Sequence, residues 1–399
     1  MPSEIFPAIA IAGVGQSRVI NTEDGTRVWP FDIDIKKLIK KIVLPCIGSV
    51  ITRRDCGLSK AVYDEISSQA EGLSLDEDGN EIHKLKVERY PDSFKECTEE
   101  ERKYIRRMLP VDKIATEIGE ENFYFFTYNS FGNTEKVVGE LDEFIRNVMS
   151  ERNAKKVNLV PVSLGGTIST AYVNRHGDRG HINRVVGVVP AFDGSSLVVK
   201  LLEGGFSENE EDIIPNEVKK LCSLLTSETR KNVIDAIFSA LQDKVLFRTS
   251  IGWGAVPHTD YERLRKSHKM SEKLAKICDE NFSIRNDFPT FLEKQRENGI
   301  EFFSLCGYGL PMEKIFRHDN RHSDGIVDTM SCSMGATCDN LEEEIDVSTS
   351  AIKDRVWFYK GMDHEGAAKN DHLLKLCGLL LKDNTITSVN DDENFKQFN

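Results

Sequence analysis

A segment near the middle of the chain reads Lys156-Val-Asn-Leu-Val-Pro161-Val162-Ser163-Leu164-Gly165-Gly166. Its first half is an apolar run, and its second half is a serine followed closely by two glycines. Apolar runs without strict alternation are typical of strands buried on both faces, as in a parallel sheet. The segment therefore predicts a buried strand, a sharp turn at Ser163, and a helix over residues 165–174.

Similar apolar runs, rich in Val, Ile and Phe, recur along the chain. They occupy residues 9–12, 123–127, 156–162, 184–190, 301–306 and 355–360. Helical patterns separate them: in residues 134–152, for example, Val137, Leu141 and Val148 fall on one stripe at helical spacing. Strands that alternate with helices predict an α/β fold with a mostly parallel central sheet flanked by helices.

Two charged, mainly helical regions interrupt this alternation. We expect a core built from residues 1–35, 122–194 and 300–382, a helical insertion over 36–121 and a helical cap over 195–299. The last residues, 383–399, form a polar tail that we expect to be frayed. The 399 residues thus form one core with two insertions.

Composition narrows the class of protein. Hydrophobic residues make up 39% of the chain, enough for a large core, which argues against a wholly disordered protein. The formal net charge of −13 argues against a nucleic-acid partner and against a polybasic patch that docks on anionic membranes. It is compatible with a neutral lipid or a small ester as substrate. No run approaches the ~18 apolar residues of a membrane span.

The N-terminal residues and the cysteines bear on where in the cell the protein is found. Glu4 precedes the first apolar run where a signal peptide has positive charge, so we interpret that run as a core strand. A secreted chain already trimmed of its signal would show the same start. The nine cysteines are scattered and include no C-x-x-C pair, which favours a reduced cytoplasm.

The turn at Ser163 has the chemistry of a nucleophile elbow. A sharp strand-to-helix turn pushes the hydroxyl out of the sheet, and the helix start supplies free amides and the positive end of a dipole. The usual pattern is G-x-S-x-G, and Pro161 replaces its first glycine. The alternative is a glycine-rich turn without a reactive serine.

A reactive serine needs a base and an orienting acid, and the order Ser, Asp, His is that of α/β-hydrolases. Asp324 follows the run at 301–306 and precedes a glycine, so it is the preferred acid, with Asp328 in reserve. His364 lies in the loop after the last predicted strand and is the preferred base. His372 lies on the following helix, and we expect it at the helix surface.

Two further motifs have competing interpretations. Gly13-Val14-Gly15 follows the first strand, and in a hydrolase the oxyanion would be bound by the amides of Val14 and Leu164. The rival is a phosphate-binding loop, but Arg18 stands where G-x-G-x-x-G has its third glycine.

A metal site is the second competing interpretation. His318 and His322, with Asp324 nearby, have spacing that could bind a metal. The glutamate of H-E-x-x-H is absent, and the composition favours a loop. We expect no metal and no cofactor.

Several motifs together resemble lecithin:cholesterol acyltransferase-like lipases. The opening loop with Gly13 is followed by the stretch Asp24-Gly-Thr-Arg-Val-Trp-Pro30, similar to the family's D-G-x-x-x-W-P. Further collinear matches are Pro190-Ala-Phe-Asp-Gly-Ser195, Cys306-Gly-Tyr-Gly-Leu-Pro311 and Asp324-Gly-Ile-Val327. The chain departs from the family at Pro161 and Val162, which stand in place of Gly and His.

The resemblance implies an α/β-hydrolase with Ser163 as nucleophile, Asp324 as acid and His364 as base. It implies cleavage of carboxylic esters through an acyl-enzyme, as in lipases, esterases, phospholipases or acyltransferases, on a small-molecule ester or lipid. Two alternatives stay open: a weak or inactive binding protein, favoured by Pro161, and a peptidase or amidase with the same triad. The natural substrate, acyl-chain length and oligomeric state are not specified by the sequence.

Overall fold

A central sheet of six parallel strands organises the computed structural model, which describes all residues except 1–4, 31–33, 91–92, 109–110, 205–222 and 313–319. The strand order is β5-β1-β6-β7-β8-β9, and every neighbouring pair is parallel. The strands are β1 (Ala8–Ile11), β5 (Phe123–Phe126), β6 (Val157–Pro161), β7 (Ile182–Val188), β8 (Glu301–Tyr308) and β9 (Val356–Lys360). Each predicted apolar run is a strand of this sheet, so the predicted α/β class is confirmed.

Helices cover the sheet on both faces. Every residue of β1, β5 and β6 is buried, and successive residues of a strand point to opposite faces. Helices α5 (Thr134–Arg152), α6 (Gly165–His176) and α13 (Phe288–Glu297) pack together, while α4 (Val111–Ile118) packs against α15 (Asp371–Lys382). The remaining helices outside the arm described next are α3 (Glu99–Met108), α7 (Ser196–Glu203), α10 (Ser250–Gly254), α11 (His258–Ser267), α12 (Glu272–Asn286) and α14 (Thr329–Cys332).

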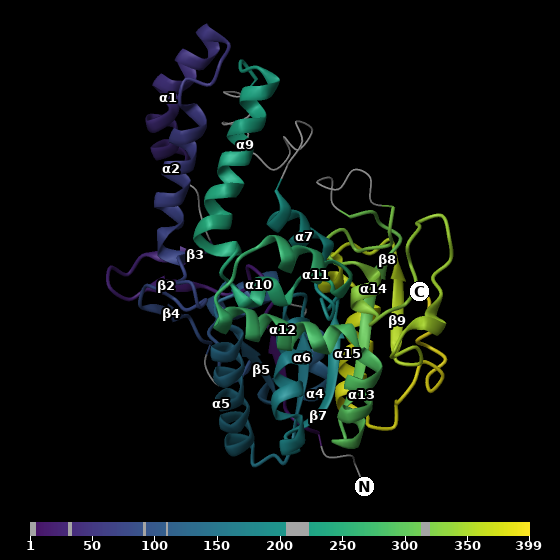
Figure 1. The fold of residues 1–399 in the computed structure, drawn as a ribbon. Helices are drawn as coiled ribbons and strands as arrows, with labels where there is room; N and C mark the ends of the chain where they lie inside the picture. Colours follow the sequence, from purple (N-terminus) through teal and green to yellow (C-terminus); the bar gives the residue numbers. More distant parts are fainter. Residues whose placement is uncertain (1–4, 31–33, 91–92, 109–110, 205–222, 313–319) are drawn as a thin grey trace.

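Three helices from both interrupting regions extend away from the sheet (Figure 1). They are α1 (Ile35–Thr52), α2 (Leu58–Ala70) and α9 (Ser227–Leu241), and we call them the helical arm. Their inward side chains form a hydrophobic cluster separate from the main core. The arm therefore joins two regions that lie far apart in the sequence.

A second, three-stranded antiparallel sheet was not predicted. It has the order β3-β2-β4, with β2 (Val19–Asn21), β3 (Arg27–Trp29) and β4 (Leu85–Val87). β4 lies inside the region that we expected to be mainly helical, and Val19 pairs with Val87. Strands of three residues that pair over so long a separation leave little periodic signal in the sequence.

The C-terminal tail is ordered against the sheet, so the expectation of a frayed tail is wrong. The amides of Phe358 and Lys360 in β9 donate to the carbonyls of Gln397 and Asn399 at 2.7 and 2.9 Å. Phe395 is buried in the main core, and its carbonyl accepts a hydrogen bond from the Trp357 indole at 3.0 Å. β9 is an outer strand with backbone groups to pair, and the tail pairs with them.

Two general features follow from the described residues. In that part of the chain, no helix combines the length and apolar character that crossing a membrane requires. Eight cysteines are free thiols, all buried except Cys56. Cys222 lies outside the described residues.

Candidate active site

Ser163 lies on the turn between β6 and α6 in a conformation that side chains seldom adopt. Its φ is +52°, in the left-handed region. Both of its backbone groups are hydrogen-bonded: the amide donates to Val188 at 3.3 Å, and the carbonyl accepts from Ala191 at 2.8 Å. This strained turn next to a parallel sheet is the architecture of the α/β-hydrolase fold.

Two glycines, and a hydrogen bond between β1 and the residue after Pro161, make the turn possible. A Cβ on Gly13 would lie 2.9 Å from the Ser163 Cβ, and one on Gly165 would lie 2.4 Å from the Ile11 carbonyl oxygen. Pro161 is the last residue of β6, and the next amide, that of Val162, donates to Ile11 at 3.1 Å. The proline therefore removes one donor without interrupting the approach of β1 to the turn.

The structure brings Ser163, His364 and Asp324 together in one chain of hydrogen bonds. The distance from Ser163 Oγ to His364 Nε2 is 2.9 Å, and that from His364 Nδ1 to Asp324 Oδ2 is 2.7 Å. Asp324 is 1% exposed, and its other carboxylate oxygen accepts from the amides of Ile326 and Val327 at 3.0 and 2.8 Å. An imidazole held in this way can accept the serine proton and return it to a leaving group.

Asp328, the reserve acid, and His372, expected at the helix surface, lie outside this chain of hydrogen bonds. Asp328 accepts hydrogen bonds from the amide and hydroxyl of Ser196 at 2.8 and 2.9 Å, which anchors the start of α7. His372 is exposed on α15, as expected, and its Nε2 donates to the carbonyl of Asn394 at 3.0 Å. Asp328 therefore holds the start of α7, while His372 holds the tail.

The amides of Val14 and Leu164 border the serine. Leu164 is the residue before α6, where backbone amides lack helical acceptors. The Val14 loop is held by Gln16, whose side-chain oxygen accepts from the Gly13 amide at 2.5 Å. Within the described ranges neither amide is assigned an acceptor in the protein, so both are available to an oxyanion.

The candidate metal ligands are not grouped among the residues that the structure describes. His322 is buried and donates through Nε2 to the Glu343 carbonyl at 3.1 Å. His318 lies outside the described residues. Among those described, no three His, Cys, Asp or Glu side chains are grouped as metal ligands.

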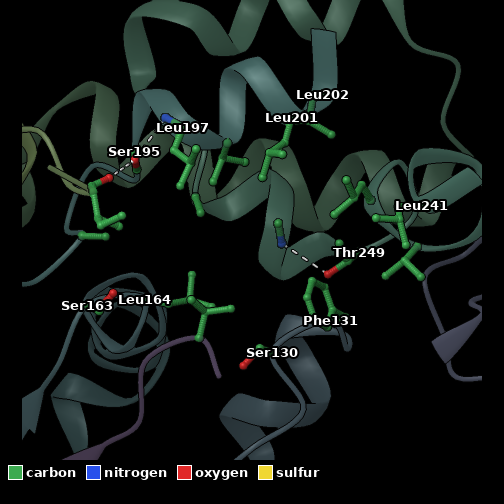
Figure 2. A pocket seen from close by; sticks show the side chains of 18 of the residues that line it. Ser130, Phe131, Ser163, Leu164, Ser195, Leu197, Leu201, Leu202, Leu241 and Thr249 are labelled. Atoms are coloured by element: carbon green, nitrogen blue, oxygen red, sulfur yellow. Dashed lines mark hydrogen bonds between the residues drawn. The ribbon is translucent and has the colours of Figure 1, made fainter. Parts of the chain in front are cut away.

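An apolar pocket of about 350 Å³ begins at Ser163. Figure 2 shows Ser163 and Leu164 at one end and Leu241 of α9 at the other. Its walls come from the core, from the loop after β5, from β3 and from α7, α9 and α10, with Trp29, Phe131, Leu197, Leu201, Leu202 and Phe238 among its lining residues. Apart from the hydroxyl residues Ser130, Ser163, Ser195 and Thr249, the lining is almost entirely apolar, so the pocket is suited to a hydrocarbon chain.

A second histidine–aspartate pair was missed by the sequence analysis. Asp193, in the loop after β7, accepts from the amide of His258 at 2.9 Å, and its Oδ2 lies 2.6 Å from His258 Nδ1. This hydrogen bond raises the pKa of His258, and burial opposes the shift. The fully buried Arg285 has its Nε 3.6 Å from Asp193. No motif connects these residues, because they meet only when α11 and α12 fold over the core.

Comparisons with known proteins give only distant likenesses. No family model and no curated protein matches the chain. Among solved structures, phospholipase PlaB from Legionella pneumophila is 11% identical with a TM-score of 0.30, over 55% of this chain and 38% of that chain. This chain thus spans well under half of PlaB.

Two further structures match over most of their length. A chain of the Tle4–Tli4 complex is 11% identical with a TM-score of 0.43, over 96% of this chain and 99% of its own. A structure from a study of carboxylesterases of Nitrososphaera gargenis is 10% identical with a TM-score of 0.31, over 94% and 90%. Because the identities and TM-scores are so low, we draw no conclusion about activity from them.

Proposed function

We propose that this protein is a serine hydrolase that cleaves carboxylic esters with apolar acyl groups. The observation that supports this most directly is the hydrogen-bonded series Ser163–His364–Asp324 at one end of an apolar pocket. The resemblance to lecithin:cholesterol acyltransferase-like lipases leads to the same residues. In this proposal the regions 36–121 and 195–299 form the cap over the site.

The chemistry proceeds in two half-reactions. Ser163 Oγ attacks the ester carbonyl while His364 Nε2 takes its proton, and the amides of Val14 and Leu164 stabilise the oxyanion. The C–O bond breaks, and the alcohol leaves with the proton from His364. A water molecule then gives its proton to His364 and attacks the acyl-enzyme, which releases the acid and restores Ser163. Asp324 keeps the imidazole in the required orientation throughout.

The pocket selects the acyl group. Burying a hydrocarbon chain is worth about 25 cal/mol per Å² of apolar surface. The surface of the pocket is almost entirely apolar, so little of the chain would lie against polar atoms. If an alcohol replaces water in the second half-reaction, the same acyl-enzyme yields acyl transfer. Hydrolysis and transfer therefore share every residue named above.

Labelling with a fluorophosphonate probe tests the nucleophile. We expect a covalent adduct on Ser163 in the wild type and none in Ser163→Ala. Absence of labelling in the wild type would favour the binding-protein alternative, and undiminished labelling of Ser163→Ala would show that another residue reacts.

A series of chromogenic esters with increasing acyl length tests the substrate class. We expect kcat/KM to rise with chain length until the pocket is full, and Ser163→Ala to abolish hydrolysis of every member. Aminoacyl amides assayed in parallel provide the contrast. Faster cleavage of the amides would indicate a peptidase or amidase.

A further inference from the structure

The outward face of α1 carries a row of apolar side chains that are exposed and belong to none of the hydrophobic clusters of the described structure. Val43, Leu44, Ile47 and Ile51 are 38%, 77%, 52% and 76% exposed. Ile47 follows Val43 and Leu44 by four and three residues, and Ile51 follows Ile47 by four, which places all of them on one stripe of the helix. They make up four of the nine large hydrophobic side chains that are exposed among the described residues, within nine consecutive positions.

This stripe is separate from the one that holds the arm together. Leu38, Ile42 and Cys46 of α1 point inward and are buried in the cluster with α2 and α9. A surface helix normally has a single apolar stripe that faces the core. The residues of the second stripe on α1 are not part of the hydrophobic cluster of the arm.

Basic residues surround the outward stripe. Residues 35–54 include six of them and no Asp or Glu, although the whole chain has a net charge of −13. They are Lys36, Lys37, Lys40, Lys41, Arg53 and Arg54, and all are exposed. Lys37 contacts Glu65 at 3.2 Å, and no acidic partner is recorded for the other five among the described residues. The exposed apolar side chains thus lie between a basic start and a basic end of the helix.

We infer that the outward face of α1 docks on the surface of an anionic phospholipid membrane. A helix with exposed apolar side chains and adjacent lysines lies in the interface, with the apolar groups at the acyl boundary and the cations at the headgroups. A second copy of the same face would place six basic residues against six others, which charge repulsion disfavours. The charge of this face complements an anionic lipid surface.

The arm connects this surface to the pocket. Phe238 and Leu241 of α9 line the pocket, and Phe238 also belongs to the hydrophobic cluster of the arm. In Figure 1 the α1–α2 hairpin and α9 lie side by side and extend from the side of the molecule where α7 and α10 lie. Docking would bring to the lipid surface the arm whose helix α9 lines the pocket. Delivery of a substrate rests on the proposed function, whereas docking itself does not.

Vesicle binding tests the inference without catalysis. Ser163→Ala protein is sedimented with vesicles of phosphatidylglycerol and phosphatidylcholine in equal parts, or of phosphatidylcholine alone. We expect binding to the anionic vesicles that weakens strongly at roughly 1 M salt, where the Debye length is about 3 Å. Equal binding to both vesicle types, or none to either, would overturn the inference.

Two pairs of substitutions locate the surface. In the same background, Lys40→Glu with Lys41→Glu should lower partitioning by more than ~10-fold, because each basic residue near an anionic surface contributes about fivefold. Leu44→Ser with Ile51→Ser should lower it as well. The matched controls are Lys266→Glu with Lys276→Glu on α11 and α12, and Ile82→Ser, which are also exposed. Equal losses in the controls would contradict docking through α1.

Other readouts separate the competing explanations. With Ser163 retained, the arm variants should hydrolyse soluble short-chain esters like the wild type, which shows that they fold. If analytical ultracentrifugation shows a dimer, and Leu44→Ser with Ile51→Ser dissociates it, then the α1 face binds a second copy of the chain and the membrane inference is wrong. Vesicle binding without fluorophosphonate labelling would leave docking intact and refute only the hydrolase proposal.

Discussion

Two histidine–aspartate pairs in this molecule have nearly the same geometry and different surroundings. The Nδ1–Oδ2 distance is 2.7 Å in His364–Asp324 and 2.6 Å in His258–Asp193. Both aspartates are buried. At the other ring nitrogen, His364 meets the Ser163 hydroxyl, whereas for His258 no partner is recorded among the described residues.

The difference shows what a carboxylate can and cannot do for a histidine. It orients the ring and stabilises its charged form, but proton transfer requires a nucleophile at the opposite nitrogen. Asp193 also faces the buried Arg285, so its pair connects the loop after β7 to α11 and α12. The first pair therefore has the arrangement for chemistry, and the second that for holding α11 and α12 against the loop after β7.

Removing the imidazole of each pair should give the largest difference in kcat/KM between the two pairs. His364→Ala should lower kcat/KM by ~10⁴-fold or more, because the base is lost, while His258→Ala should stay close to the wild type. Steady-state hydrolysis of one chromogenic ester measures both. Comparable losses in the two variants would mean that His258 also takes part in the reaction.

Neutralising each aspartate should give losses of different kinds. Asp324→Asn should reduce kcat by ~10⁴-fold, as expected when the orienting acid of a triad is lost, with little change in the fold. Asp193→Asn should lower the free energy of unfolding by ~3–5 kcal/mol, because it leaves the charge of Arg285 buried without its partner. Kinetics and chemical denaturation, run on both variants, check this division, and an inactive but fully stable Asp193→Asn would contradict it.

Of the two pairs, only His364–Asp324 is connected through Ser163 to the apolar pocket. A larger side chain at Leu241 would fill the far end of that pocket. Leu241→Trp should reduce kcat/KM for long-chain esters by ~10–100-fold, because the end of the chain loses its space. Short esters should be cleaved as before. The ratio of the two rates is the measurement, and an unchanged ratio would mean that the acyl chain binds elsewhere.

The smallest effect should come from the protonation of His258. Its pKa is raised above 6.5 by the hydrogen bond to Asp193, so it stabilises the fold fully below about pH 6.5, and the stabilisation is lost as the pH rises through the raised value. His258→Gln should therefore lower the melting temperature by a few degrees in acid, with a deficit that shrinks in alkali. His372→Gln is the control, because the recorded partners of its ring among the described residues are the Tyr359 hydroxyl and the Asn394 carbonyl.

The sequence was most informative where local and global signals agree. Apolar runs identified all six strands of the main sheet, and the motif around Ser163 marked the turn where the structure has a positive φ. The order of three loops selected His364 and Asp324, which the structure brings within hydrogen-bond distance of one another. Whether they act as a triad remains the proposal tested above.

What the sequence did not reveal depends on contacts between distant segments. β4 pairs with β2 through only three residues, and His258 meets Asp193 only after α11 has folded against the loop after β7. The net charge is a sum over the whole chain and does not show the basic residues of 35–54, although these are close in sequence. The exposure of the apolar side chains between them follows only from the fold. Properties that arise from spatial grouping require the fold.

The ordered C-terminal tail has a consequence for how the protein behaves in concentrated solution. β9 is an outer strand of a hydrophobic sheet, and an open edge of this kind is a template for pairing with other chains. Gln397 and Asn399 occupy the backbone groups of Phe358 and Lys360 that would otherwise be exposed. The final residues thus protect the molecule from edge-to-edge aggregation.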